Sequence, residues 1–291
     1  MAELREGYLQ TRDGRIYYRS LGDGFLTPLV LLHGGPGFPS DYLVGFESLA
    51  VNRRVILYDQ LGCGRSDHCE DRPELWQLER FIDELGQVLD ELGVQRAALF
   101  GNSWGAMLAA GFALRFPERV SGLICASPCL STRLWLEDAQ MCKEEMGEEW
   151  NLSLARLEQE GRTESPEFER LKEEFNQRFV CRLVPSPQVI EKAHERFGAH
   201  VYRAMWGPAE FVCTGNLKDQ DLSDELFKIG VPVLFTCGKY DEARPETVRF
   251  YASRIPGAKV NVFHHSAHLA HLEEPGAFFS SLANFLHEIG E

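Results

Sequence analysis

The fold is decided by the stretch Ala97-Ala98-Leu99-Phe100-Gly101-Asn102-Ser103-Trp104-Gly105. Its first four residues are apolar, and residues 106–114 directly after it have the composition of a helix. Ser103 therefore falls on a strand-to-helix turn, with Gly101 and Gly105 two residues away on either side. Such a turn is so tight that the flanking positions must lack side chains, and it lifts the serine hydroxyl clear of the sheet edge. The pentapeptide alone is equally compatible with an ordinary glycine-rich turn, so other segments must decide.

Upstream, a second apolar run leads into a glycine-rich loop. Residues 28–32 have the pattern of a buried strand, and His33-Gly34-Gly35-Pro36-Gly37 follows it directly. Backbone without side chains can approach a ligand closely and present an N–H group, as an oxyanion hole requires. The proline removes one donor and stiffens the loop.

Downstream, an acid and a histidine each follow a predicted strand. Asp241 and Glu242 come soon after the apolar run 231–237, and His268 comes soon after the run 260–263. The chain order is therefore serine, aspartate, histidine. This order resembles the catalytic triad of the α/β-hydrolases and differs from the orders in the two familiar serine-protease folds.

The alternation of strand-like and helical segments along the chain predicts an α/β fold of the α/β-hydrolase type, with a mostly parallel central sheet flanked by helices. Short strand-like runs alternate with helical ones, as a parallel sheet requires. The predicted strands are 16–21, 29–32, 55–58, 97–100, 123–126, 231–237 and 260–263, and the clearest predicted helices are 74–92, 106–114 and 278–289.

The segment after Pro128 has a different pattern, with long stretches of helical periodicity such as 152–157 and 168–179. We therefore predict three parts: a core in residues 1–127, a helical cap in 128–225 inserted between two core strands, and the rest of the core in 226–291. Ligands of open α/β sheets bind beyond the carboxyl ends of the strands, so an insertion there should roof the site. The alternative is a solvated acidic appendage without a role in binding.

The composition argues against several classes of protein. The 291 residues carry a formal charge of −14, which argues against nucleic-acid binding, because phosphate contacts need clustered lysine and arginine. No apolar stretch approaches the roughly 20 residues that cross a bilayer, and residues 1–6 lack the pattern of a secretory signal. We accordingly expect a cytoplasmic protein without membrane association, whose eight cysteines stay reduced.

Neither a metal nor a cofactor is predicted. The cysteines form no Cys-x-x-Cys pair. His264 and His268 have the i, i+4 spacing of a helical metal site, and His265 and His271 lie nearby. This segment follows a strand, however, and lacks the glutamate of the metal motif, so we do not expect it to bind a metal.

Taken together, the motifs resemble the proline iminopeptidase family, which includes the tricorn-interacting aminopeptidase. The resemblance extends over nearly the whole chain. It rests on His33-Gly34-Gly35-Pro36-Gly37, Asp59-Gln60-Leu61-Gly62-Cys63-Gly64-Arg65-Ser66, Gly101-Asn102-Ser103-Trp104-Gly105, Gly207-Pro208-Ala209-Glu210-Phe211, Gly238-Lys239-Tyr240-Asp241-Glu242 and His268 with Glu273-Glu274-Pro275. The first two motifs together are the most specific for this family. Asn102 and Ala106 depart from residues that are usual in the family, without removing a catalytic group.

The resemblance implies a peptidase that takes one residue from the amino end of a short peptide. Ser103 is the expected nucleophile, His268 its general base and later the acid, and Asp241 the group that orients the imidazole. The backbone N–H groups of Gly35 and Trp104 are the expected oxyanion hole.

A free amino end is a cation at neutral pH, and the resemblance assigns its recognition to Glu210 and Glu242. Two plainer interpretations stay open: Glu242 as a loop acid that tunes the field around Asp241, and Glu210 as a surface acid. We further expect Asp59 and Arg65 to brace their loop by an ion pair. A separate set could line an apolar pocket or belong to the core: Trp104, Tyr202, Met205 and Trp206.

Three function classes follow. The favoured one is a serine aminopeptidase that acts on short peptides, or on small amides and esters with a free amine, and prefers proline or another small N-terminal residue. The second is an esterase, amidase or carbon–carbon hydrolase on a non-peptide molecule. The third is a catalytically silent binding module, which would need a broken triad. The sequence does not indicate the preferred residue, the peptide length, the oligomeric state or whether the cap opens.

Overall fold

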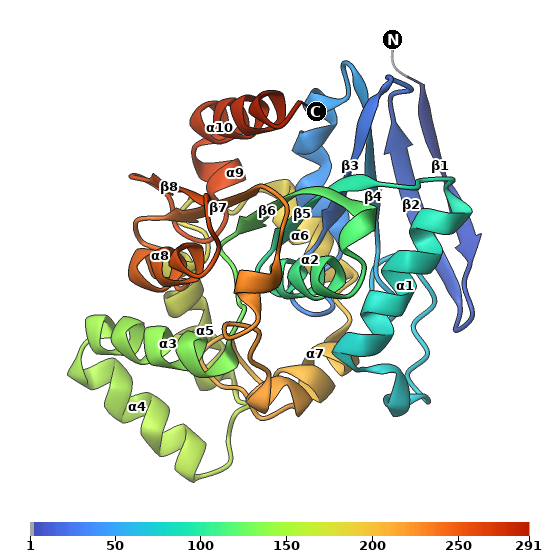
Figure 1. Ribbon diagram of the computed structural model, residues 1–291. Helices are drawn as coiled ribbons and strands as arrows, with labels where there is room; N and C mark the ends of the chain where they lie inside the picture. Colours follow the sequence, from blue (N-terminus) through green and yellow to red (C-terminus); the bar gives the residue numbers. More distant parts are fainter. Residues whose placement is uncertain (1–2, 291) are drawn as a thin grey trace.

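Residues 3–290, which the computed structural model describes, form an eight-stranded sheet with helices on both faces (Figure 1). The strand order is β1-β2-β4-β3-β5-β6-β7-β8. The first two pairings, β1 with β2 and β2 with β4, are antiparallel, and all the others are parallel. The strands are β1 (Leu4–Gln10), β2 (Arg15–Leu21), β3 (Leu26–Leu32), β4 (Arg53–Tyr58), β5 (Ala97–Asn102), β6 (Val120–Ala126), β7 (Val233–Gly238) and β8 (Lys259–Phe263).

Helices connect the parallel strands and cover both faces of the sheet. They are α1 (Leu78–Glu91), α2 (Trp104–Arg115), α3 (Thr132–Met146), α4 (Glu148–Gln159), α5 (Pro166–Phe179), α6 (Gln188–Glu195), α7 (Ala199–Met205), α8 (Pro245–Ser253), α9 (Ala270–Glu273) and α10 (Pro275–Glu288). Short 3-10 helices supplement them: η1 (Ser40–Leu49), η2 (Pro73–Leu75), η3 (Pro117–Arg119), η4 (Asn216–Asp219) and η5 (Leu226–Lys228).

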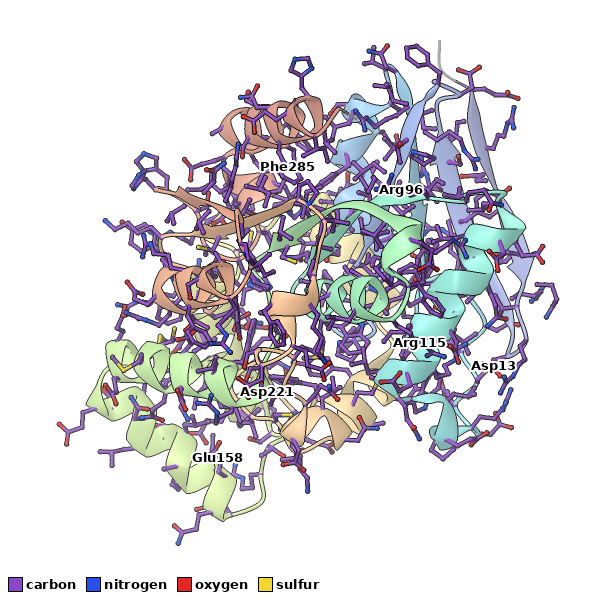
Figure 2. All side chains as sticks on the ribbon, in the orientation of Figure 1. Asp13, Arg96, Arg115, Glu158, Asp221 and Phe285 are labelled. Atoms are coloured by element: carbon purple, nitrogen blue, oxygen red, sulfur yellow. The ribbon has the colours of Figure 1, made fainter. Side chains whose placement is uncertain are left out.

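The alternation of side chains along β3 shows how the two faces are built. Val30 and Leu32 join the cluster that contains the apolar faces of α1, α2 and α8. Leu29 and Leu31 point the other way and join the cluster of η1 and α10, to which Phe285, labelled in Figure 2, also belongs. Successive strand residues point to opposite faces, so a fully apolar strand buries both. The predicted α/β class with a mostly parallel sheet is confirmed.

Two elements differ from the sequence prediction. Strand β1 is not among the predicted strands; its residues are largely exposed, so no buried face marks it in the sequence. The helix expected over 74–92 is interrupted, because Gln77 is extended and α1 begins only at Leu78. Trp76 is buried there against Phe81 and His200, with ring centroids 6.4 and 5.2 Å apart. Tertiary burial of this indole overrides the local helical preference.

Helices α3 to α7 lie between β6 and β7 in the chain; α3, α4, α5 and α7 lie below the sheet in Figure 1, whereas α6 packs against η1. Helices α3, α4 and α5 share a separate hydrophobic cluster with Ala209 and Phe211, whereas the buried residues of α7 join the main core cluster. The aromatic members of the separate cluster are Trp150, Phe168, Phe175, Phe179 and Phe211. Within residues 3–290, no helix combines the length and the apolar character needed to span a bilayer.

Candidate active site

Ser103 lies on the sharp turn between β5 and α2. Its φ of 57° and ψ of −120° lie outside the regions that non-glycine residues usually adopt. A Cβ on Gly101 would meet the carbonyl oxygen of Gly105 at 2.1 Å, and a Cβ on Gly105 would meet that of Leu32 at 2.2 Å. Both glycines are therefore required by close backbone approach, as the sequence predicts for this turn.

Replacement of Gly105 by alanine is expected to destabilise the fold severely, by about 3 kcal/mol or more, because backbone atoms rather than a flexible side chain obstruct the new methyl group. Urea unfolding followed by circular dichroism measures this. The matched control is Gly276→Ala, near the start of α10, where nothing lies within 4 Å of the added atom. Equal midpoints for the two variants would contradict the argument.

His268 and Asp241 form a buried pair. The imidazole Nδ1 lies 2.8 Å from Asp241 Oδ1, and the two side chains are 6% and 0% exposed. The same carboxylate accepts backbone N–H groups from Ala243 at 2.9 Å and Gly238 at 3.2 Å, so both of its oxygens are engaged. With Nδ1–H donated to Asp241, the Nε2 atom of His268 carries the free lone pair.

The loop that carries Asp241 is anchored to α3 by an acid that the sequence analysis did not identify. Asp138 accepts the backbone N–H of Arg244 at 3.1 Å and the hydroxyl of Thr247 at 2.8 Å. Burial raises the pKa of Asp138 to about 7. More than one hundred residues separate the partners, so no local pattern reveals this contact.

Gly35 and Trp104 line a narrow pocket beside Ser103. Trp104 is the first residue of α2, where backbone N–H groups have no acceptor within the helix. Its indole N–H donates to Gln60 Oε1 at 2.8 Å, and the Gln60 amide donates to the carbonyl of His33 at 3.0 Å. This chain of contacts ties the glycine-rich loop to the serine turn.

Asn102, which departs from the family pattern, takes part in a second set of hydrogen bonds between the glycine-rich loop and the serine turn. Its Oδ1 accepts the hydroxyl of Tyr42 at 2.8 Å, and its amide donates to the carbonyl of Ala126 at 3.2 Å. The Tyr42 oxygen in turn accepts the backbone N–H of Gly34 at 2.8 Å. The sequence analysis missed Tyr42, because its role depends on a contact across 60 residues.

A cavity of about 1490 Å³ opens over Ser103 and His268. Its walls come from the core and from α5, α6 and α7, and it extends to Glu158 on α4, labelled in Figure 2. Both candidate amine ligands, Glu210 and Glu242, line the same cavity. The structure thus brings together the side chains that the sequence analysis singled out from four distant segments.

The two glutamates are in an unusual electrostatic state. Glu242 is 1% exposed, and its Oε2 has no hydrogen-bond partner among residues 3–290. Burial, followed by the charges of Glu210 and Asp241, raises the pKa of Glu242 well above its usual value. Burial also raises the pKa of Glu210, although the hydrogen bond from the Tyr202 hydroxyl, at 2.9 Å, acts in the opposite direction. A buried carboxyl group without a partner costs free energy that a bound cation would recover.

Trp135 on α3 was also missed. Its indole N–H donates to the carbonyl of Glu210 at 3.0 Å. Its ring meets that of His268 edge to face, with centroids 5.7 Å apart and planes at 89°. It therefore contacts both the imidazole and the backbone of a candidate amine ligand.

The aromatic candidates divide between the site and the core. Tyr202 lines the large cavity, Trp104 and Trp206 line the narrow pocket, and Met205 is fully buried in the main core cluster. The sequence analysis left pocket and core open for this set, and both occur.

The predicted ion pair between Asp59 and Arg65 is present, at 3.4 Å. Arg65 makes a closer pair with Asp41, at 2.7 Å, and its backbone N–H donates to Asp59 Oδ2 at 2.9 Å. The loop is therefore braced by two carboxylates rather than one.

The histidines after β8 separate in space. His264 and His265 are exposed, whereas His271 is buried beside the carbonyl of Tyr42, at 3.2 Å. Burial lowers the pKa of His271 to about 3. The residues from His264 to His268 form turns rather than a helix, so their i, i+4 spacing does not place them on one face.

Residues 27–275 match the family described as the alpha/beta hydrolase fold, and the chain belongs to that family. Within it, the chain belongs to the proline iminopeptidase family and is a hydrolase. It is 40% identical to the proline iminopeptidase of Heyndrickxia coagulans, over 98% of this chain and 99% of that protein.

Two solved structures are similar over nearly their whole length. The proline iminopeptidase of Mycobacterium smegmatis is 34% identical, with 98% of each chain covered and a TM-score of 0.91. The crystal structure of VinJ is also 34% identical, covers 98% of this chain and 99% of its own, and has a TM-score of 0.94.

Proposed function

We propose that this enzyme is a serine aminopeptidase that releases an N-terminal residue, proline or another small apolar residue, from short peptides through an acyl-enzyme intermediate. The observation that carries the proposal is the buried carboxyl group of Glu242, which lines the same cavity as Ser103 and His268 and whose Oε2 has no hydrogen-bond partner among the described residues. The similar proteins named proline iminopeptidase support the choice of substrate.

In the proposed mechanism, Ser103 Oγ attacks the scissile carbonyl while His268 Nε2 accepts its proton. Asp241 keeps Nδ1 protonated, so the lone pair stays on Nε2, and it stabilises the imidazolium that forms. The imidazolium then protonates the leaving amine, and a water molecule completes hydrolysis by the reverse transfer. The N–H groups of Gly35 and Trp104 stabilise the oxyanion; a donor of this kind typically contributes roughly 3 kcal/mol.

Recognition of the free amine is assigned to Glu210 and Glu242. A bound ammonium group donates hydrogen bonds to both carboxylates, and these bonds fix the scissile bond over Ser103. An N-acyl group removes the cation and cannot supply the same donors, so blocked peptides should be rejected. The narrow pocket beside Ser103 is lined by the apolar side chains of Met107, Cys129 and Trp135, and its volume of about 10 Å³ leaves room for little more than one water molecule.

We further propose that residues 128–225 form a cap over a core made of 1–127 and 226–291. Its helices α5, α6 and α7 contribute walls to the cavity, and α3 contributes Trp135 to the narrow pocket. The cap in this proposal sets which peptides enter, and the core performs the reaction.

The deciding experiment compares prolyl, alanyl and N-acetyl-prolyl chromogenic amides with a simple acyl ester on one enzyme preparation. We expect the free prolyl amide to be cleaved fastest and the acetylated one to be inert. Preference for the ester, or equal turnover of blocked and free amides, would favour a non-peptide hydrolase with the same three residues.

The raised pKa of Glu242 predicts that substrate binding releases a proton. The free enzyme holds a proton on this carboxyl group at a pH where an ordinary glutamate is ionised, and the bound ammonium favours the ionised form. Affinity should therefore rise with pH while the substrate amine stays cationic. Calorimetry of the Ser103→Ala variant with a prolyl peptide, in two buffers of different ionisation enthalpy, measures the released protons. Uptake instead of release would contradict this assignment, and Glu242→Gln should reduce the release.

A further inference from the structure

His68, Glu70 and His200 come together where the loop after β4 meets α7. His68 and Glu70 lie on the loop after β4, and His200 lies on α7. One nitrogen of each imidazole and one oxygen of the carboxylate lie within 4.8 Å of one another. The sequence analysis could not find this group, because some 130 residues separate the two histidines.

The hydrogen bonds of His200 orient its ring for ligation. Its Nε2 lies 2.8 Å from the backbone carbonyl of His68, so Nε2 carries the proton and donates it there. In the neutral ring Nδ1 is then a lone pair, and it faces Glu70 Oε1 at 3.9 Å. When Nδ1 is unprotonated, it and this carboxylate oxygen are two donor atoms within reach of one cation. A ring N–H bound to a backbone carbonyl is also the usual support of a metal-binding histidine.

We propose that His68, Glu70 and His200 bind a divalent transition-metal ion such as zinc. Two imidazoles and one carboxylate are a donor set that zinc accepts, with water in the fourth position. Ligands about 2.1 Å from a tetrahedral ion lie about 3.4 Å apart. Small rotamer changes of the two exposed side chains, His68 and Glu70, close the present spacing.

The metal would connect two parts of the chain that both reach the cavity. Helix α7 carries His200 and, two residues later, Tyr202, whose hydroxyl donates to Glu210. His200 also packs edge to face on Trp76, with centroids 5.2 Å apart. A bound ion therefore fastens α7 to the core loop and reduces local opening of this helix.

The test is a calorimetric titration of the metal-free protein with Zn²⁺. We expect one saturable site whose affinity falls at least about tenfold in His68→Ala and in His200→Ala, and falls in Glu70→Gln. The matched control is His287→Ala, on α10 and outside this group, which should bind like the wild type. Zn²⁺ should also slow hydrogen exchange in α7 of the wild type and not of His68→Ala, whereas Mg²⁺ should do neither.

Absence of saturable Zn²⁺ binding would overturn the proposal. So would binding that persists unchanged in both histidine variants, or that is lost instead in a variant of the exposed His264. Because His68 and Glu70 are exposed, their replacement should leave the fold intact, and a circular dichroism melt verifies this. Neither readout involves substrate, so the result is independent of the proposed peptidase activity.

Discussion

Replacement of Ser103 by alanine is expected to lower kcat/KM on a prolyl amide by roughly 10⁴- to 10⁶-fold. The hydroxyl oxygen is the atom that forms the acyl-enzyme bond in the proposed mechanism, and the nearby side chains offer no substitute in the same position. Residual turnover would come from the oxyanion donors and from binding alone. The substrate should still bind, because the carboxyl groups of Glu210 and Glu242 are untouched.

The matched control is Ser121→Ala on β6. Ser121 is also a buried serine, and its Oγ has no hydrogen-bond partner in the described part of the chain. Its replacement should leave the rate unchanged. Both variants should unfold near the wild-type temperature, so a difference in rate reports chemistry. Wild-type rates in a purified, folded Ser103→Ala enzyme would contradict the proposed serine mechanism.

The parts of the site that the sequence could predict are those with a local signature. The turn around Ser103 is marked by apolar residues, two glycines and a helix within a short stretch. Asp241 and His268 each follow a buried strand, and parallel strands bring their carboxyl ends to one edge of the sheet. Position after a strand is therefore enough to suggest that these side chains meet.

The supporting residues had no such signature. Tyr42, Asp138 and Trp135 act through single contacts across large separations in the chain, and each would suit an ordinary core or surface position. The break before α1 has the same cause, since burial of Trp76 depends on a neighbour from α7. Tertiary packing decides such positions, and local pattern does not encode it.

The burial of Glu242 is likewise not predictable from the local sequence, and it has an energetic cost. A sequence shows only an acid next to Asp241, which suits a solvated loop. The structure shows a carboxyl group that is 1% exposed and has one oxygen without a partner among the described residues. A protein keeps such a group at a cost in stability, and this is expected where binding requires it.

Glu242→Gln is therefore expected to change activity and stability in opposite directions. On a free prolyl amide, kcat/KM should fall by roughly 10²- to 10³-fold, because a charged partner of the substrate amine is lost in a buried site. On an unspecific acyl ester the loss should stay within about threefold, because no ammonium group is involved. Glu210→Gln should show the same contrast between the two substrates.

Stability should move the other way. The pKa of Glu242 is raised in the folded protein, so the acid contributes stability at low pH and loses it as pH rises above the unfolded value of about 4.3. The glutamine variant lacks this loss, and its free energy of unfolding should exceed that of the wild type increasingly towards neutral pH. Urea unfolding at several pH values measures the difference.

The matched control is Glu158→Gln, which removes an exposed carboxylate that lines the same cavity; Glu158 is labelled in Figure 2. It removes one carboxyl group from the cavity, as Glu242→Gln does, and should not alter the contrast between the two substrates. If Glu158→Gln and Glu242→Gln lowered amide turnover alike, the general negative field of the cavity would explain the effect. An equal loss on amide and ester in Glu242→Gln would instead show that the residue supports Asp241 and His268 and does not bind the amine. Only a selective loss on the free amine, together with a gain in stability, fits a carboxyl group kept buried for a cation.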